Sequence, residues 1–357
     1  MSRIKILHII SGDLWAGAEV QVFTLIKQLR QCSDVKTIIL NDGELATRIR
    51  KIGVSVIILD ESQFSTLQIF LKIRKILMCF NPDIVHTHRQ KENILGALAN
   101  VTTIRARSVR TVHGKNEFSF NFRAKMQGIV ERLVTTCFCN VIIAVSEDLR
   151  KKLHSEFPTK IVKVIYNGVD VEELKKNTGI AQFKKDKPDK KHIGMIGRLV
   201  AVKRVDIFLK ISEIIKREIE GEYFFHIVGD GPLRSELEIL ASKLGVTDVV
   251  QFHGHRSDIP SIINSLDVVV MCSDYEGLPM TALETIALDS ILLAHKIGGL
   301  AELACYNNVF LTDINRERNY TKKLVEISGS RIKTVNFSHT ANKNMSEIFS
   351  IYSAMLD

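Results

Sequence analysis

Fifteen residues decide the fold of this chain: Ser273-Asp-Tyr-Glu-Gly-Leu-Pro-Met-Thr-Ala-Leu-Glu-Thr-Ile-Ala287. They follow the apolar run Leu266-Asp-Val-Val-Val-Met-Cys272 without a break. This order predicts a buried strand, a short turn and then a helix, with Pro279 suited to the first helical turn. The unbonded N–H groups of that turn would face the strand end, and anionic groups bind at such places.

Two glutamates belong to this stretch. Glu276 lies in the turn, and Glu284 lies eight residues later, roughly 12 Å along the axis if all of the segment were helical. Carboxylates pair well with sugar hydroxyls, because each oxygen accepts a charge-assisted hydrogen bond. The pattern predicts a site for a phosphorylated sugar compound. Two solvated acids on a helix surface are the alternative that the pair alone leaves open.

The composition is typical of a globular protein with two domains. The 357 residues, 45% of them hydrophobic, are enough for two domains that each bury a core. No apolar segment of the sequence approaches the ~20 uncharged residues of a membrane helix. The six cysteines show neither a disulfide framework nor zinc-binding spacing. We therefore expect a reduced, cytoplasmic protein.

The positive charge is concentrated in one half of the chain. Residues 1–170 hold 25 Lys and Arg against 15 Asp and Glu, a net charge of +10, and the remainder has a net charge of −1. A basic half suits nucleic acid, an anionic membrane surface or an acidic acceptor. No nucleic-acid-binding motif is present in the sequence, so we expect no nucleic-acid partner.

Short β-rich runs alternate with helical patterns in two series. The first series is 5–10, 36–40, 55–59, 84–88, 107–111 and 141–145, and the second is 192–198, 223–228, 249–252, 268–272, 291–294 and 309–311. This alternation predicts an α/β protein with two doubly wound parallel sheets. We place a linker at 175–191, which is rich in Lys and Asp and poor in apolar residues, between domains at 1–174 and 192–336. The tail, 337–357, has apolar residues at helical spacing.

The chain resembles the retaining glycosyltransferases with the GT-B fold, glycosyltransferase family 4. The resemblance rests on Glu276 and Glu284 with seven residues between them, on Ile297-Gly-Gly-Leu-Ala-Glu302 after them, and on Gly197-Arg-Leu-Val-Ala-Val-Lys-Arg204. It implies two Rossmann-like domains that face a central cleft, with the acceptor bound by the N-terminal domain and a nucleotide-sugar donor by the C-terminal one. It also implies that the last helix returns to the N-terminal domain.

The resemblance assigns roles to individual residues. It implies that Glu284 binds the ribose hydroxyls and Glu276 the donor sugar. Arg198 and Lys203 lie near one strand end and would stabilise the charge that develops on a diphosphate leaving group. The other expected donor-binding residues are Gly17, His255, Arg256, Gly277, Leu278, Pro279, Met280 and Thr281. Because no Asp-x-Asp motif is present in the sequence, we expect neither a metal nor a cofactor.

Two stretches place histidines just past predicted strand ends, Asp83-Ile-Val-His-Thr-His88 and Arg110-Thr-Val-His-Gly114. A lone histidine at such a place is more often a hydrogen-bonded structural residue. His113 nevertheless matches the family position that faces the reacting sugar. The resemblance therefore adds His113 to the catalytic set of Glu276, Arg198 and Lys203, while a structural role stays open.

The segment 118–134 mixes apolar and basic side chains: Phe118, Phe120, Phe122, Met126 and Ile129 with Arg123, Lys125 and Arg132. This composition suits a membrane interface, and an amphipathic packing helix is an equal alternative. Many bacterial members of the resembled family build surface polysaccharide. We therefore expect a glycan or lipid-linked acceptor, such as a lipopolysaccharide or capsule intermediate, and an enzyme that docks on the inner face of the cytoplasmic membrane.

Three other functions compete with this hypothesis. A nucleotide-sugar epimerase shares the architecture, and a catalytically silent sugar-binding protein would keep part of the site. A nicotinamide oxidoreductase is disfavoured, because Val228-Gly-Asp-Gly-Pro-Leu-Arg234 lacks the last glycine of the dinucleotide fingerprint. The sequence leaves the base, the sugar and the acceptor undetermined.

Overall fold

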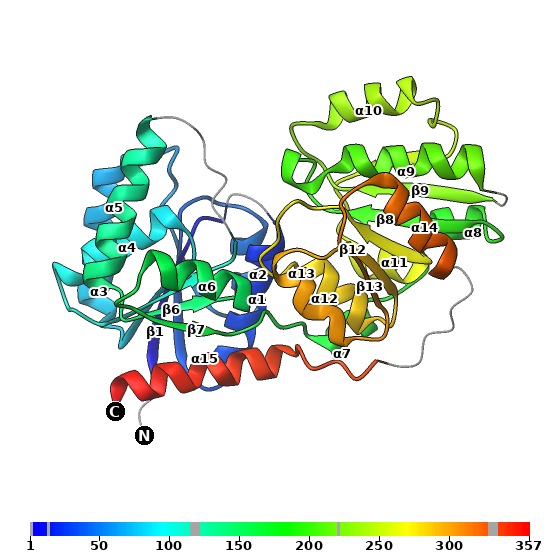
Figure 1. Ribbon diagram of the computed structural model, residues 1–357. Coiled ribbons are helices and arrows are strands. Elements are labelled where there is room, and N and C mark those ends of the chain that lie inside the picture. Colours follow the sequence, from blue (N-terminus) through cyan, green and yellow to red (C-terminus); the bar gives the residue numbers. More distant parts are fainter. Residues whose placement is uncertain (1–2, 13–14, 115–121, 220–221, 328–334) are drawn as a thin grey trace. The chain divides into compact units, whose positions relative to one another are not determined.

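A computed structural model describes residues 3–12, 15–114, 122–219, 222–327 and 335–357. The chain forms two compact units, unit 1 (Met1–Gly168 with Ala341–Asp357) and unit 2 (Val169–Thr340). Each unit has one parallel sheet with helices packed on it (Figure 1), so the predicted α/β class with two doubly wound domains is confirmed.

Unit 1 is built on a parallel sheet in the order β3-β2-β1-β4-β5-β6-β7. Its strands are β1 (Lys5–Ile10), β2 (Asp34–Ile39), β3 (Ser55–Ile58), β4 (Ile84–Thr87), β5 (Arg107–Val112), β6 (Val141–Ala144) and β7 (Ile161–Val164). Its helices are α1 (Gly17–Leu29), α2 (Glu44–Lys51), α3 (Thr66–Phe80), α4 (Gln90–Val101), α5 (Phe122–Phe138), α6 (Glu147–Glu156) and α15 (Ala341–Leu356).

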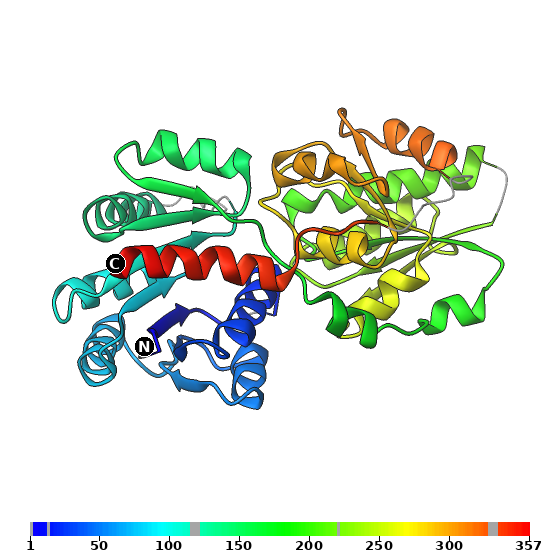
Figure 2. The same ribbon diagram turned by 90° about the horizontal axis from the view of Figure 1, so that it is seen from below.

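The two faces of the unit 1 sheet bury different helices, because successive side chains of a strand point to opposite faces. Ile6 and Ile10 of β1 pack in one cluster with α1 and α15, whereas Leu7 and Ile9 pack in another with α3 and α4. The C-terminal helix α15 lies beside α1 (Figure 2), and its Tyr352 is fully buried. Each such buried side chain stabilises the fold by about 1.5 to 3 kcal/mol, so the last helix is part of the core of unit 1.

Unit 2 is built on a parallel sheet in the order β10-β9-β8-β11-β12-β13. Its strands are β8 (Lys191–Ile196), β9 (Tyr223–Val228), β10 (Val250–Gly254), β11 (Val268–Met271), β12 (Ile291–His295) and β13 (Val309–Thr312). Its α-helices are α7 (Val171–Lys176), α8 (Gln182–Asp186), α9 (Val205–Glu218), α10 (Arg234–Lys243), α11 (Ile259–Ser265), α12 (Met280–Ala287), α13 (Gly298–Ala301) and α14 (Glu317–Ile327). Two 3-10 turns, η1 (Ala201–Lys203) and η2 (Glu302–Cys305), complete the unit.

The structure differs from the sequence prediction at the boundary between the units. The boundary lies at 168–169, and the segment 175–191 that was predicted as a linker packs on unit 2. The Ala181 N–H donates to Ser265 Oγ at 2.7 Å, and the Phe183 ring stacks on His226 at a centroid distance of 4.0 Å. Specific contacts such as these attach a segment whose composition is that of a linker.

One strand was not predicted. The edge strand β7 reads Ile161-Val-Lys-Val164, and its side chains are exposed or half-buried. Because an edge strand has one neighbour and little core to face, a four-residue run with a lysine in it resembles a loop in the sequence.

Candidate active site

The stretch that the sequence singles out forms a strand, a turn and a helix at the carboxyl edge of the unit 2 sheet. The buried strand β11 ends at Met271, the turn occupies 272–279, and α12 begins at Met280 with Pro279 as its N-cap residue. An α-helix leaves the N–H groups of its first turn without a helical carbonyl. Met280 and Thr281 therefore present N–H donors at the strand ends, where parallel sheets bind ligands.

Glu276 is held in this turn by two partners. Lys203 Nζ and Ser273 Oγ each donate to Glu276 Oε1, both at 2.6 Å. Lys203 and Glu276 lie 73 positions apart in the chain and are largely buried. A buried ion pair of this kind is stable only as a pair, because removing one partner leaves an uncompensated charge.

The glycine pair Gly298-Gly299 packs directly against the backbone of this turn. A Cβ atom at Gly299 would lie 1.7 Å from the Gly277 carbonyl oxygen, and one at Gly298 would lie 2.1 Å from the Glu276 carbonyl oxygen. The Gly299 N–H also donates to the Glu276 carbonyl at 3.2 Å. The sequence indicated this pair as a family signature, and the structure gives its physical reason, which is close backbone approach.

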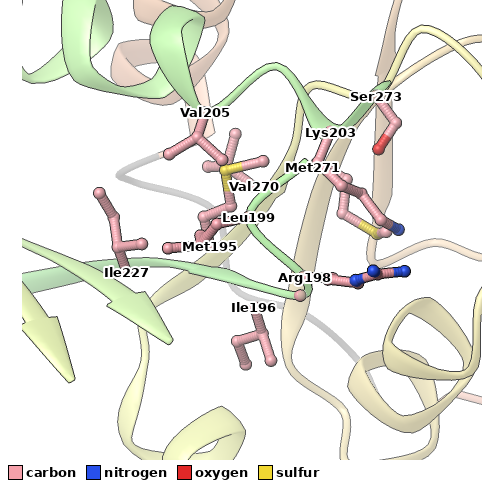
Figure 3. A pocket seen from close by; sticks show the side chains of 11 residues that line it. Met195, Ile196, Arg198, Leu199, Lys203, Val205, Ile227, Val270, Met271 and Ser273 are labelled. Atoms are coloured by element: carbon pink, nitrogen blue, oxygen red, sulfur yellow. The ribbon is translucent and has the colours of Figure 1, made fainter. Parts of the chain in front are cut away.

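Arg198 and Lys203 line one small pocket together with Ser273. Both cationic side chains extend to the same side of it (Figure 3). Arg198 is exposed, and among the described residues it has no ion-pair partner. The pocket thus offers one cation already paired with a carboxylate and one available to an anionic group.

Arg204 connects the two loops of the site, a role that the sequence analysis missed. Its guanidinium forms a two-point ion pair with Asp206, at 3.0 Å for each bond, and reaches Asp274 at 3.3 Å. Asp274 in turn receives a hydrogen bond from Asn315 at 2.9 Å. The signal was present in the sequence, because Arg204 directly follows Lys203, but its partner lies 70 positions away.

Glu284 sits in the second turn of α12, and burial raises its pKa to about 7. In the part of the chain that the structure describes, no cation lies within ion-pair distance of its carboxyl group. An unpaired carboxyl group with this pKa titrates near neutrality, and its ionised form is an acceptor for two hydroxyl donors.

His255 and Arg256 follow β10, at the edge of the same sheet, and both are exposed. Arg256 forms a two-point ion pair with Asp258, at 2.8 and 2.7 Å. Because Asp258 already binds two nitrogens of the guanidinium, the predicted ligand would have to contact Arg256 alongside Asp258.

Gly17 and His113 belong to unit 1. Gly17 is the exposed first residue of α1, with Ala16 as the N-cap residue. Nearby, Ser11 Oγ donates to Glu92 Oε1 at 2.5 Å, and Arg89 pairs with Glu19. His113 follows β5 and accepts or donates at Nε2 to His88 Nδ1, 3.3 Å away. Burial lowers the pKa of His113 to about 4, so its ring is neutral at pH 7.

One group in the described part of the chain has metal-binding spacing. Ring nitrogens of the buried residues His8, His86 and His88 lie within 4.8 Å of one another. His86, however, already uses both nitrogens on hydroxyl groups, Nδ1 on Tyr352 at 2.6 Å and Nε2 on Thr111 at 2.8 Å. A metal ion there would have to displace one of these bonds, so the hydrogen-bonded arrangement describes the group better.

Helix α5 has a buried side and an exposed apolar side. Its Glu131 pairs with Arg110 of β5 and is buried, and Thr135 Oγ1 accepts a hydrogen bond from Arg110 at 3.2 Å in the same interior. Its Met126, Ile129 and Leu133 are 46%, 54% and 60% exposed. Residues 115–121, with the predicted Phe118 and Phe120, lie outside the described residues, and so do the side chains of Phe122 and Arg123. None of the described helices is long and apolar enough to cross a membrane.

Two family models match the chain. The model described as Glycosyltransferase Family 4 matches residues 15–173, and the model described as Glycosyl transferases group 1 matches residues 177–344. The matches adjoin each other and include the carboxyl-edge loops of both sheets.

Two relatives are similar along nearly their whole length. The UDP-Gal:alpha-D-GlcNAc-diphosphoundecaprenol alpha-1,3-galactosyltransferase of Escherichia coli is 27% identical, over 96% of this chain and 92% of that protein. The GalNAc-alpha-(1->4)-GalNAc-alpha-(1->3)-diNAcBac-PP-undecaprenol alpha-1,4-N-acetyl-D-galactosaminyltransferase of Campylobacter jejuni is 24% identical, over 94% of this chain and 96% of that protein.

Among solved structures, the fold is similar to that of Anabaena HepE in complex with UDP and glucose. The TM-score is 0.84 at 20% sequence identity, and the alignment covers 98% of this chain and 100% of that one. At this identity the likeness shows the fold alone.

Proposed function

This chain belongs to the glycosyltransferases of family 4, the glycosyl transferases group 1, and from that membership we propose that it transfers a hexose from a UDP-sugar to a lipid-linked glycan. The observation that carries the proposal is the arrangement of Arg198, Lys203 and Glu276 around the start of α12. UDP is proposed as the nucleotide because the E. coli relative is named for UDP-Gal and the Anabaena structure contains UDP.

The unit 2 site has the parts that departure of a diphosphate requires. The glycosidic bond breaks with negative charge accumulating on the leaving group, which preorganised cations and helix N–H groups stabilise. Arg198 is available for that charge, and Lys203 is held toward the pocket by Glu276. The Glu276 carboxylate would bind hydroxyl groups of the donor sugar through its second oxygen, while Glu284 accepts from the ribose hydroxyls.

Retention of configuration is part of the proposal. The two relatives are both named for α linkages, and no side chain of the unit 2 site is an obvious covalent nucleophile, since Glu276 is tied to Lys203 and Ser273. Transition-state stabilisation and activation of the leaving group would then account for the rate.

The proposed acceptor is a glycan on an undecaprenyl diphosphate, or a related lipopolysaccharide or capsule intermediate, because both relatives are named for diphosphoundecaprenol-type acceptors. Such an acceptor is held at a membrane, and the exposed apolar residues of α5 lie beside exposed Lys125 and Arg132. An apolar helix face with basic neighbours suits an anionic lipid surface. We expect a cytoplasmic enzyme that binds the inner face of the membrane peripherally.

Turnover with a panel of nucleotide sugars tests the proposal. We expect UDP release from one UDP-hexose that depends on an undecaprenyl-diphosphate-linked sugar. Change of the donor sugar without any acceptor would favour an epimerase, and saturable UDP-sugar binding without product would favour a sugar-binding protein.

Catalysis without a metal is a separate expectation: activity should survive excess EDTA, whereas loss that magnesium restores would contradict it.

Vesicle flotation tests the membrane contact. Binding should require anionic lipid and weaken as salt rises, because each basic residue at such a surface contributes about 1 kcal/mol. The variant Lys125→Glu with Arg132→Glu should lose most binding. The matched control, Lys175→Glu with Lys176→Glu, makes the same charge change on exposed residues of α7 and should bind normally. Equal flotation of both variants, or equal recovery with neutral vesicles, would contradict the assignment of α5.

A further inference from the structure

The turn that carries Glu276 leaves the sheet before it reaches the helix. Strand β11 pairs with β12 as far as Met271, which lies opposite Ala294. The next two carbonyl groups belong to Cys272 and Ser273, and both residues are fully buried. A buried carbonyl group needs a hydrogen-bond donor, and beyond the paired part of a strand that donor has to come from another segment.

Two side chains from neighbouring strand ends supply these donors. Asn315, which follows β13, donates from Nδ2 to the Cys272 carbonyl oxygen at 2.7 Å. His295, the last residue of β12, has its Nδ1 2.9 Å from the Ser273 carbonyl oxygen. A carbonyl oxygen can only accept a hydrogen bond, so Nδ1 of His295 carries a proton and donates this bond.

His295 is linked to Glu276 through one residue. The Ser273 carbonyl accepts from His295, and the Ser273 hydroxyl donates to Glu276 Oε1 at 2.6 Å. Further along the segment that begins with His295, the Gly299 N–H donates to the Glu276 backbone carbonyl at 3.2 Å. The segment 295–299 therefore holds both the first and the last residue of 273–276, the part of the turn that orients the carboxylate.

The bonds of Asn315 lead elsewhere. Its Nδ2 also donates to Asp274 at 2.9 Å, and its Oδ1 accepts from the Tyr320 hydroxyl at 2.8 Å. Within the described residues, neither of these partners bonds to the Glu276 carboxylate. Of the two donors, it is therefore His295 that bonds to a residue which itself holds the carboxylate.

We propose that His295 is a positioning residue of the donor site. It fixes the Ser273 backbone, which directs the Ser273 hydroxyl at Glu276 Oε1 and leaves Oε2 for the donor sugar. The contact between Glu276 and the sugar rests on the proposed function, whereas the link from His295 to the turn does not. A carboxylate that is held before the ligand arrives needs less reorganisation on binding, so His295 contributes to the use of the donor.

The second nitrogen of His295 offers an alternative role. Among the described residues Nε2 makes no hydrogen bond, and the side chain is half-buried at the carboxyl edge of the sheet. A direct contact between Nε2 and the ligand is therefore the reading that the experiment has to separate from positioning.

Three substitutions of His295 separate the two roles. His295→Leu removes both nitrogens. His295→Asn puts an amide N–H where Nδ1 was, since both nitrogens are bonded to Cγ, and so keeps the carbonyl bond. His295→Gln puts an amide near the place of Nε2 and loses that bond. The control Lys296→Leu removes the next side chain, which pairs with exposed Asp313 at 3.0 Å instead.

Hydrogen exchange followed by mass spectrometry tests the link in the ligand-free protein. Peptides that cover 272–279 should exchange at least about threefold faster in His295→Leu and His295→Gln, because the turn loses one hydrogen bond. They should exchange at the wild-type rate in His295→Asn and Lys296→Leu, and unchanged exchange of β1 shows that the variants fold. Wild-type exchange of the turn in His295→Leu would overturn the proposal, whether or not the protein is a glycosyltransferase.

Kinetics with a UDP-sugar that the wild-type protein turns over tests the consequence for the donor. The kcat/KM should fall about 5- to 10-fold in His295→Leu and His295→Gln, in line with one lost hydrogen bond, and should stay within about twofold in His295→Asn and Lys296→Leu. Affinity for UDP alone, measured by calorimetry, should change less than about twofold in every variant, because Glu276 contacts the sugar and not the nucleotide.

Each departure from this pattern has a separate meaning. Normal kcat/KM in a His295→Leu protein whose turn exchanges faster would refute the positioning role. Activity that His295→Gln keeps and His295→Asn loses would assign Nε2 to the ligand and would also overturn the proposal. A wild-type protein that turns over no UDP-sugar would refute the proposed function alone, because the exchange measurement needs no substrate.

Discussion

Unit 1 and unit 2 both bring polar side chains to the carboxyl edge of a parallel sheet, but the groups differ in charge. In unit 2 the edge carries Arg198, Lys203 and Glu276, which are charged. In unit 1 it carries His88 and His113, which burial keeps neutral, together with the Arg89–Glu19 ion pair, whose charges offset each other. The unit 2 edge therefore has the cations that a diphosphate requires, whereas the two histidines of unit 1 offer neutral groups.

Each unit also contains a chain of hydrogen-bonded histidines. In unit 2, His192, His226 and His253 are linked at 2.8 Å for each bond, and the chain ends on the Lys187 carbonyl oxygen. In unit 1, His8, His88 and His113 are linked at 3.0 and 3.3 Å, and within the described residues the nitrogen at each end lacks a partner. The two chains therefore differ in whether their ends are hydrogen-bonded and not in residue type.

The largest effect should come from the cations of unit 2. Arg198→Ala should lower kcat by more than tenfold, because a contact that stabilises developing charge is worth ~2 to 4 kcal/mol. Arg198 is the cleaner target, since Lys203→Ala would also strand the Glu276 carboxylate. Steady-state kinetics measures the change, and Arg217→Ala, which removes an exposed guanidinium on α9, is the control. Equal turnover of Arg198→Ala and Arg217→Ala would contradict the role of Arg198 in stabilising the leaving group.

Glu284 should give the next largest effect, on donor affinity. Hydrogen bonds to a charged group contribute about 1.5 to 3 kcal/mol, so Glu284→Gln should weaken UDP-sugar binding by about tenfold or more. The Glu284 pKa of about 7 predicts the direction of a pH dependence. The proposed ribose contact requires the ionised carboxylate, so affinity should strengthen as pH rises through 7. Calorimetry with an intact UDP-sugar, whose diphosphate does not titrate in this range, measures both. A pH dependence that persists in Glu284→Gln would assign it to another group.

The histidine chain of unit 2, His192–His226–His253, should affect stability and not turnover. His226→Leu leaves His192 Nδ1 and His253 Nε2 without partners, and each lost bond to a buried group costs about 1 to 3 kcal/mol in the free energy of unfolding. Urea unfolding should register that loss, while kcat per folded molecule stays near the wild-type value. A fall in kcat of about tenfold or more in folded His226→Leu would contradict a purely structural role for this chain.

Acid should weaken both units through their neutral histidines. Folded pKa values of about 3 for His8 and about 2 for His226 lie below the ordinary value of 6.5, so the unfolded chain binds more protons below pH 6.5. Stability is then fully present above that pH and is lost as pH falls, by up to about 1.4 kcal/mol per pH unit for each histidine. Unfolding curves recorded at several pH values between about 7.5 and about 5 measure how steeply stability falls with pH. His8→Leu with His226→Leu should flatten this slope, and an unchanged slope would contradict the buried neutral rings.

Much of the fold could be predicted from the sequence because apolar runs mark buried parallel strands. The strands near residues 5, 84, 107, 192 and 268 lie where the pattern puts them. The edge strand β7 could not be found in this way, because its side chains are not buried. The segment around Ala181 and Phe183 could not be distinguished from a linker, because specific contacts and not its composition attach it to unit 2.

The residues of the candidate site could be proposed from the sequence, but their contacts could not. The family motifs pointed to Arg198, Lys203, Glu276 and Glu284, and the structure brings the first three to one edge of a sheet. The Lys203–Glu276 pair depends on two loops from different parts of the chain, which periodicity does not relate. The hydrogen bond between His8 and His88 could not be predicted either, because the partner of a histidine within an apolar strand is known only when the neighbouring strands are known.

The stereochemistry of the product tests the central claim most directly. The enzyme is incubated with an α-linked UDP-hexose that it uses and with an undecaprenyl-diphosphate-linked GlcNAc acceptor or a short-chain analogue. The anomeric configuration of the new linkage is then read by nuclear magnetic resonance. Retaining transfer at the unit 2 site predicts an α-linked product, which forms more than about tenfold more slowly when Arg198→Ala replaces the wild-type enzyme. A β-linked product would contradict retention, and an altered UDP-sugar with no transferred hexose would contradict glycosyl transfer itself.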